Sequence, residues 1–99
     1  MLNLNEHSNG EVVVSLGDNF TFANHLEFRN ILKQALALAT RLKFDLGQIK
    51  YIDSSGLGML MLAKYEARTQ QCELELINVS TDAMRIFKLV HFEEQFTIR

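Results

Sequence analysis

Residues 51–62 read YIDSSGLGMLML, a stretch that places one acidic residue and two hydroxyls directly before two glycines and an apolar run. A strand that ends near Ile52 and a helix from Ser55 to about Thr69 are the expected local structures. Two interpretations of the polar residues are open. In the first, these polar residues cap the helix, because hydroxyl and acidic side chains accept hydrogen bonds from its free N–H groups. In the second, a hydroxyl that can be modified lies beside an apolar surface that binds a partner.

The rest of the chain repeats this alternation of strands and helices. Asn9-Gly10 is typical of a two-residue hairpin loop, and the valines that follow it form the strongest β-branched run. Spacing and capping residues predict an edge strand at 2–5, a strand at 12–16, helices at 23–38 and 55–69, alternating strands at 42–46 and 73–77, a short helix within 79–92 with Met84, Phe87 and Leu89 inward, and a closing strand within 93–99.

The predicted order is therefore β-β-α-β-α-β-α with a final β. Lys43 and Asp45 form a charged side of one alternating strand, as Glu73 and Glu75 do in the other. Strands covered on both faces would instead read as continuous apolar runs. The sequence thus predicts a single α/β domain over residues 1–99, with a mixed four- to five-stranded sheet and helices mainly on one face.

Composition narrows the functional classes. The 99 residues are 47% hydrophobic and 22% charged, which is typical of one globular domain. A net charge of −2 without a dense basic block argues against nucleic acid and anionic membranes as partners. The apolar run Met59 to Ala63 is too short to span a bilayer. With Cys72 as its single cysteine and no signal-peptide pattern, the protein is expected to be cytoplasmic.

In a sheet of this type, sites gather where parallel strands end and the next helices begin. A phosphate on a hydroxyl there would be stabilised by free N–H groups and by the helix dipole. It would change the local charge by about −1.5 to −2 and leave the fold intact. Gly56 would open the turn into the helix, and Gly58 would let another chain approach closely.

The apolar residues of the second helix form two stripes, which are Leu57, Leu60 and Met61 and then Met59, Leu62 and Ala63. Only one stripe can face the sheet. The other either packs under a neighbouring helix or remains as a docking patch, for which methionine is well suited.

Other chemistries are poorly supported. His7, His25 and His91 are scattered and lack the spacing of metal ligands. Ser54 and Ser55 are not set in the Gly-x-Ser-x-Gly elbow of hydrolases. We expect no catalytic residue, no metal and no cofactor in this protein.

The stretch YIDSSGLGMLMLAKYEA, in its strand–helix setting, resembles the STAS domain of bacterial anti-sigma-factor antagonists. The likeness covers nearly the whole chain, and NVSTDAMRIFKLVHFEEQF is similar to the last helix of that family. In the family, the serine directly after the aspartate is phosphorylated by a GHKL-type serine kinase that is also the anti-sigma factor. The matching residue is Ser54, with Ser55 as the alternative acceptor and expected helix cap, and Asp53 would position the hydroxyl.

The resemblance implies partner switching. The unphosphorylated protein, a monomer in isolation, would bind the kinase/anti-sigma factor, phosphorylation of Ser54 would release it, and a PP2C-like phosphatase would reverse the change. The predicted partner-binding residues are Asp53, Ser55, Gly56, Leu57, Gly58, Met59 and Met61, together with Asp18, Asn19 and Phe20.

One segment departs from the family pattern. The family usually carries Gly-x-apolar-Asp after the second strand, whereas GDNF at 17–20 places Phe20 where the aspartate is expected. Asp18 or Asn19 would have to take its role. The segment FTFANHLEFR is more similar to STAS modules of anion transporters. The second hypothesis is therefore a constitutive interaction subunit, of a transporter or other complex, in which Ser54 is never modified.

Overall fold

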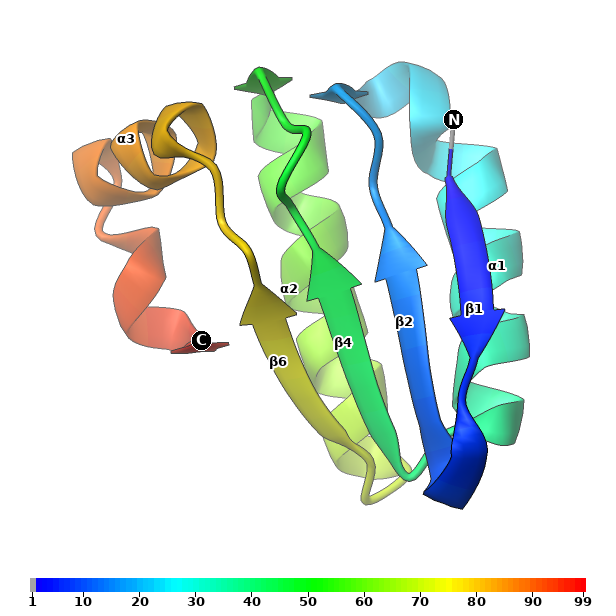
Figure 1. Cartoon of the computed structure of the whole chain (residues 1–99). Helices are drawn as coiled ribbons and strands as arrows, with labels where there is room; N and C mark the ends of the chain where they lie inside the picture. The colour runs from blue at the N-terminus through cyan, green and yellow to red at the C-terminus, as the bar shows by residue number, and fades with distance from the viewer. Residues whose placement is uncertain (1) are drawn as a thin grey trace.

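A computed structural model describes residues 2–99, which form a mixed five-stranded sheet of order β1-β2-β4-β6-β7 (Figure 1). Strand β1 is antiparallel to β2, and the remaining neighbours in this sheet are parallel. The strands of this sheet are β1 (Asn3–Glu6), β2 (Glu11–Ser15), β4 (Arg41–Asp45), β6 (Glu73–Ile77) and β7 (Thr97–Ile98). The predicted order of elements, the mixed sheet and the closing strand are confirmed.

A second, two-stranded parallel sheet lies beyond the carboxyl ends of β2 and β4 (Figure 1). It pairs β3 (Asn19–Phe20) with β5 (Tyr51–Ile52). The carbonyl of Asp18 accepts hydrogen bonds from the N–H groups of Lys50 and Tyr51 at 2.7 and 3.2 Å. The sequence predicted a strand that ends near Ile52 but not its partner β3. Strand β3 leads toward the helix that begins at His25, and β5 leads into the helix that begins at Ser54.

Helices α1 (His25–Leu38) and α2 (Ser54–Thr69) lie side by side on one face of the sheet, and α3 (Thr81–Leu89) lies near the β6 edge (Figure 1). This arrangement confirms that the helices are mainly on one face. Short 3₁₀ helices are η1 (Ser8–Gly10), η2 (Phe22–Asn24) and η3 (Phe92–Gln95). Across residues 2–99, no helix has both the length and the apolarity that crossing a membrane requires.

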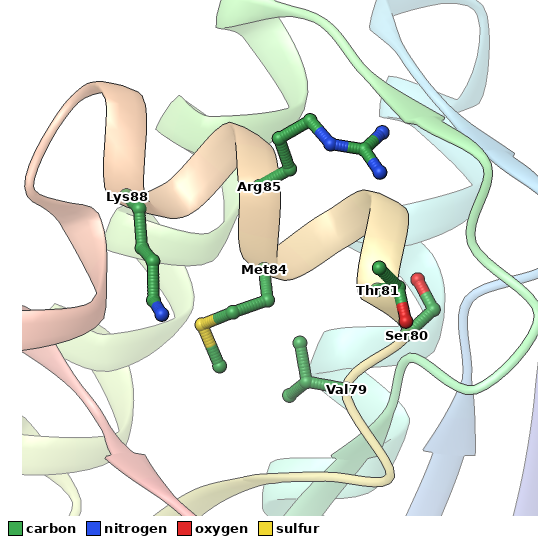
Figure 2. Close-up of a pocket in the computed structure, with 6 residues that line it drawn as sticks. All are labelled: Val79, Ser80, Thr81, Met84, Arg85 and Lys88. Carbon is green, nitrogen blue, oxygen red and sulfur yellow. The ribbon is translucent and has the colours of Figure 1, made fainter.

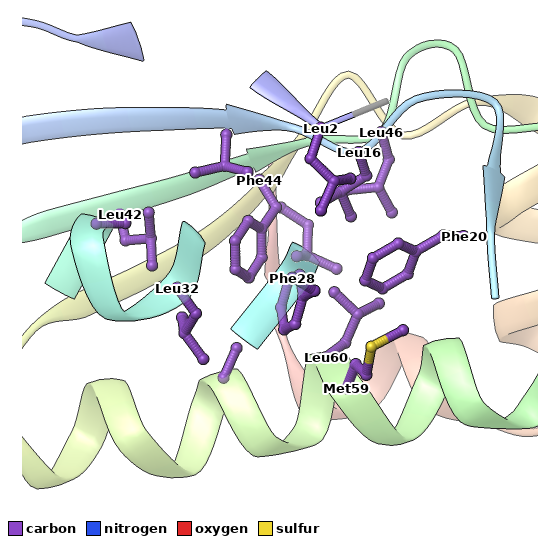
Figure 3. Packing of buried hydrophobic residues seen from close by; sticks show 14 of the residues in the cluster. Leu2, Leu16, Phe20, Phe28, Leu32, Leu42, Phe44, Leu46, Met59 and Leu60 are labelled. Carbon is purple, nitrogen blue, oxygen red and sulfur yellow. The ribbon is translucent and has the colours of Figure 1, made fainter. Parts of the chain in front are cut away.

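The core fills the space between the sheet and the two helices (Figure 3). Phe28 of α1 is fully buried, with its ring centroid 5.1 Å from that of Phe20 and 5.6 Å from that of Phe44. Leu60 of α2 is also fully buried. Leu42 and Phe44 of β4 are fully buried, because alternate side chains of a strand point to opposite faces.

The uncovered face of the sheet carries charges in register. Lys43 lies opposite Glu75, and the Glu11 carboxylate lies 3.5 Å from Arg41 and 3.3 Å from Lys43. Arg99 pairs with Glu75 at 3.2 Å. Exposed pairs of this kind contribute about 0–1 kcal/mol each, so they set the polarity of this face more than its stability.

The hairpin loop is longer than the sequence predicted. Pairing ends at Glu6 and Val12, and His7 then donates its N–H to the Glu11 carbonyl at 2.8 Å, leaving Ser8–Gly10 as the loop. Asn9 and Gly10 are the residues with φ of 65° and 77°, so the tight turn itself lies where the sequence placed it.

The predicted inward position of Leu89 in α3 is wrong, because this side chain is 77% exposed while Phe87 is fully buried. The buried line of α3 runs through Ala83 and Phe87, which are one turn apart. A residue two positions beyond Phe87 is rotated by about 200° around the helix and therefore faces outward.

These two neighbouring positions give a test of the packing of α3. We expect Phe87→Ala to lower the free energy of unfolding by about 3–5 kcal/mol, since it leaves a cavity in the core. The matched change Leu89→Ala should alter it by less than about 0.5 kcal/mol. Urea denaturation followed by circular dichroism measures both, and equal losses would contradict the observed packing.

Candidate functional site at the start of helix α2

Asp53 caps the helix that begins at the motif. Its backbone is extended, and Oδ1 accepts a hydrogen bond from the N–H of Gly56 at 2.7 Å. The expectation that Ser55 is the cap is wrong, since Ser54 and Ser55 are already the first two residues of α2. Only the residue before the first helical position can direct its side chain back onto the N–H groups of the first turn.

The second oxygen of Asp53 reaches another segment. Oδ2 accepts a hydrogen bond from the N–H of Phe22 at 3.1 Å, across 31 positions of sequence. The carboxylate therefore joins the start of η2 to the start of α2. The side-chain hydrogen bonds of Asp53 go to the backbone N–H groups of Gly56 and Phe22, so the predicted effect of Asp53 on the Ser54 hydroxyl would act through the helix start that it caps.

Ser54 is exposed at the first position of α2, and Ser55 is half-buried at the second. The first N–H groups of a helix lack partners within the helix, and Asp53 takes only that of Gly56 here. The Ser54 hydroxyl therefore lies at the positive end of the helix dipole, where an added phosphate would be stabilised. It is the more accessible of the two predicted acceptors.

An exposed row of residues follows Ser54 along α2. It continues through Gly58, Met61 and Tyr65, of which Met61 is 37% and Tyr65 69% exposed. Steps of three and four residues place side chains on the same side of a helix. We call these four residues the α2 ridge, and it presents apolar and aromatic groups beside a modifiable hydroxyl.

A second exposed apolar surface lies at the start of α1. Phe22 is 61% exposed, Leu26 is 68% exposed, and the Phe22 ring stacks on His25 with centroids 4.4 Å apart. The hydrogen bond from Phe22 to Asp53 holds this surface beside the start of α2. Sequence reasoning missed both residues, although Leu26 lies outside the spacing of the buried residues of α1, which begin at Phe28.

Three predicted partner-binding residues are not available for contact. Phe20 is fully buried against Phe28, Met59 is 7% exposed, and Gly56 is buried at the base of the helix. The prediction that these three residues contact a partner directly is therefore wrong, because they are packed in the core. Leu57 is half-buried and packs against the core.

The predicted division of α2 into two stripes is also wrong. Its buried face takes members of both, and consists of Gly56, Met59, Leu60, Ala63 and Ala67. At about 100° per residue, Met59 and Leu60 both lie within one broad inward face, and Met61 turns away from it.

Two other predicted partner-binding residues, Asp18 and Asn19, are exposed, as a partner contact requires.

The two glycines of the motif lie in different surroundings. A Cβ atom on Gly56 would collide with the Phe20 carbonyl and lie 2.7 Å from Cγ2 of Ile52. A Cβ atom on Gly58 would meet nothing within 4 Å. Gly56 therefore allows the close approach of α2 to β3 and β5, and Gly58 leaves an open place on the α2 ridge.

Away from the motif, the pKa of one thiol is shifted by its surroundings. Burial raises the pKa of the Cys72 thiol, although a backbone hydrogen bond from Leu42 opposes this. This thiol is buried at the start of β6, next to the other end of α2. Within residues 2–99, no group of three or more histidine, cysteine or acidic residues is arranged to hold a metal ion.

Comparison with known proteins identifies the class to which this fold and site belong. The profile of the family described as "Mlab, STAS domain" matches residues 4–98. The chain belongs to this STAS family, which confirms the resemblance found in the sequence.

Individual relatives agree with this assignment. A STAS-domain containing protein of Pseudomonas aeruginosa is 31% identical over 88 residues, covering 89% of this chain and 87% of the relative. The unphosphorylated anti-sigma factor antagonist SpoIIAA has the same fold, with a TM-score of 0.81, 17% identity and coverage of 100% of this chain and 88% of SpoIIAA. The phosphorylated form of the Bacillus cell fate determinant SpoIIAA has a TM-score of 0.76 and 17% identity, and the match covers 100% of this chain and 91% of the other.

The same fold also occurs in a sulfate transporter family protein from Wolinella succinogenes. That structure has a TM-score of 0.78 and 15% identity, and the match covers 92% of this chain and 75% of the other. The fold is therefore shared by an anti-sigma antagonist and a transporter protein.

The two glycines allow a matched test of the site. Gly56→Ala should destabilise the protein by about 2 kcal/mol or more, because its methyl group has no room beside the Phe20 carbonyl. Gly58→Ala should stabilise it by up to about 1 kcal/mol, because alanine is the better helix former and the methyl group is free. Thermal unfolding of both variants measures this, and destabilisation by Gly58→Ala would show that the site is not open.

Proposed function

We propose that this protein is an anti-sigma-factor antagonist controlled by phosphorylation of Ser54. The unphosphorylated form binds a GHKL-type serine kinase that acts as an anti-sigma factor, and the phosphorylated form releases it. The observation that carries the proposal is the position of Ser54, which is exposed on the same ridge as Met61 and Tyr65. The match of Asp53-Ser54-Ser55-Gly56 to the family motif supports it.

The switch works through desolvation. The partner covers the α2 ridge with apolar groups, and docking removes water from this surface. A phosphate on Ser54 brings a charge of about −1.5 to −2, which cannot be buried against apolar groups without a large cost. Because Ser54 points away from the core, the modification alters the surface while the buried face of α2 stays packed.

The partners supply all chemistry of the switch. The kinase transfers the γ-phosphoryl group of ATP to Oγ of Ser54, so that the bond to the ADP oxygen breaks and the hydroxyl proton leaves to the kinase. A PP2C-like phosphatase adds water across the phosphoester and restores the hydroxyl. We assign no catalytic residue to this chain, which presents an acceptor and a docking surface.

The second candidate is a constitutive STAS subunit of a transporter or other complex. It is favoured by Phe20, which is buried where the antagonist pattern has an aspartate, so that no carboxylate is offered from that position. The shared fold with a sulfate transporter family protein agrees with it. In this case, Ser54 is never modified and the same exposed surfaces hold a permanent partner.

Phosphate transfer separates the two candidates. We expect the protein, incubated with ATP and a GHKL-type serine kinase from its own organism, to gain one phosphate that mass spectrometry places on Ser54. Ser54→Ala should abolish the labelling, whereas Ser55→Ala should retain it because Ser55 is not the acceptor. The phosphorylated form should bind the kinase at least about 100-fold more weakly in calorimetry. Binding without labelling would favour the constitutive subunit.

The α2 ridge can be tested apart from phosphorylation. Met61→Glu should weaken partner binding at least about tenfold, since it places a charge in an apolar contact, while unfolding changes by less than about 1 kcal/mol. Met59→Glu should unfold the domain, because this side chain is buried. Leu89→Glu on α3 is the control with an exposed leucine, and equal weakening by this variant would place the docking surface elsewhere.

A further inference from the structure

A groove of about 440 Å³ lies between α1 and α2, away from the Ser54 end of the helices. The two helices run side by side on the same face of the sheet (Figure 1). The floor of the groove is apolar and consists of Leu32, Leu36 and the half-buried Leu62. Its walls are polar and consist of Arg29, Asn30 and Lys33 from α1 and Glu66 and Gln70 from α2.

The charges of this groove are unbalanced. Arg29 and Lys33 lie one helical turn apart and are exposed. The ion pairs among residues 2–99 involve other cations, so neither side chain has a carboxylate within 4.0 Å. Glu66 is the one acidic residue of the groove lining. A protein of net charge −2 therefore presents a locally cationic groove with a leucine floor.

We propose that this groove binds an acidic amphipathic helix of a partner protein. Apolar side chains of that helix contact the leucine floor, and carboxylates spaced by four residues lie over Arg29 and Lys33, whose spacing is the same. Recognition of an amphipathic helix by an apolar groove is a common mode of peptide binding. A cation of the partner helix opposite Glu66 fixes its direction.

The composition of the groove favours a protein helix over a polyanion such as nucleic acid or an anionic membrane. Those ligands are bound through many cations, whereas this groove offers two together with an opposing carboxylate and an apolar floor. The groove residues do not include Ser54 or the α2 ridge. The proposal therefore holds whether the protein is a phosphorylation switch or a constitutive subunit.

A second hollow, of about 480 Å³, lies along α3 and provides a comparison (Figure 2). Met84 and Val79 are close together in it, while the Arg85 guanidinium points away and pairs with Asp82 at 3.0 Å. Lys88 is then the one cation without a carboxylate partner at this hollow. The hollow therefore lacks the two neighbouring unpaired cations of the α1–α2 groove. It serves as the control surface.

The probe is a synthetic helical peptide with leucines along one face and glutamates four residues apart beside them. Titration into the ¹⁵N-labelled full chain, up to about 1 mM, should shift the amide resonances of residues 29–36 and 62–70 more than those of α3. The peptide with lysines in place of the glutamates should not bind. Affinity for the acidic peptide should fall as salt rises, because exposed charges are screened beyond about 10 Å at 0.1 M.

Charge reversal tests the residues. Arg29→Glu combined with Lys33→Glu should weaken binding of the acidic peptide about tenfold or more and allow the lysine peptide to bind. Lys88→Glu, the matched control on α3, should change neither, and circular dichroism should show all variants folded. Glu66→Gln should strengthen binding of the acidic peptide.

Four results would overturn the proposal. They are no shift with the acidic peptide, equal binding of both peptides, shifts confined to α3, or tighter binding of a DNA duplex or of anionic phospholipid vesicles than of the peptide. None of these results affects the phosphorylation of Ser54, because that reaction is measured at a different surface with a different reagent.

Discussion

The arrangement of the site depends on the two hydrogen bonds that the Asp53 carboxylate accepts. One oxygen binds the N–H of Gly56 and starts α2, and the other binds the N–H of Phe22 and fixes the segment that leads into α1. Two helices that are separated in sequence thereby begin at one place. Gly56 completes this junction, since only a residue without Cβ lets α2 approach the Phe20 carbonyl. The exposed groups of both helices are positioned by this small junction.

The division of α2 into a buried and an exposed face is what the proposed function requires, because one helix then supports the fold while its other face is free to be regulated. Leu60 and Ala63 are fully buried against the sheet, while Ser54 and Tyr65 face outward. Charge added outside therefore leaves the apolar contacts inside unchanged. The uncovered face of the sheet carries ion pairs in register, whereas Met61 and Tyr65 on the helical side are exposed.

The helical side carries surfaces of two kinds, apolar and cationic. The α2 ridge and the Phe22–Leu26 surface are apolar and lie next to the modifiable hydroxyl. The groove farther along α1 and α2 is cationic above its leucine floor. A partner that contacts both would be oriented by the groove and regulated at the ridge. A partner that contacts only the α2 ridge would respond to modification of Ser54, and a partner that contacts only the groove would not.

The order of the main elements, the charged open face of the sheet and the strand-to-helix position of Ser54 were predictable from the sequence, because these depend on local periodicity and on a motif of adjacent residues. Which apolar residues are exposed became clear from the packing of the folded chain. This packing buried Phe20 and Met59, turned Leu89 outward and brought Phe22 to Asp53. Burial depends on which neighbour a helix face meets, and contacts between residues far apart in the chain leave no periodic pattern in the sequence.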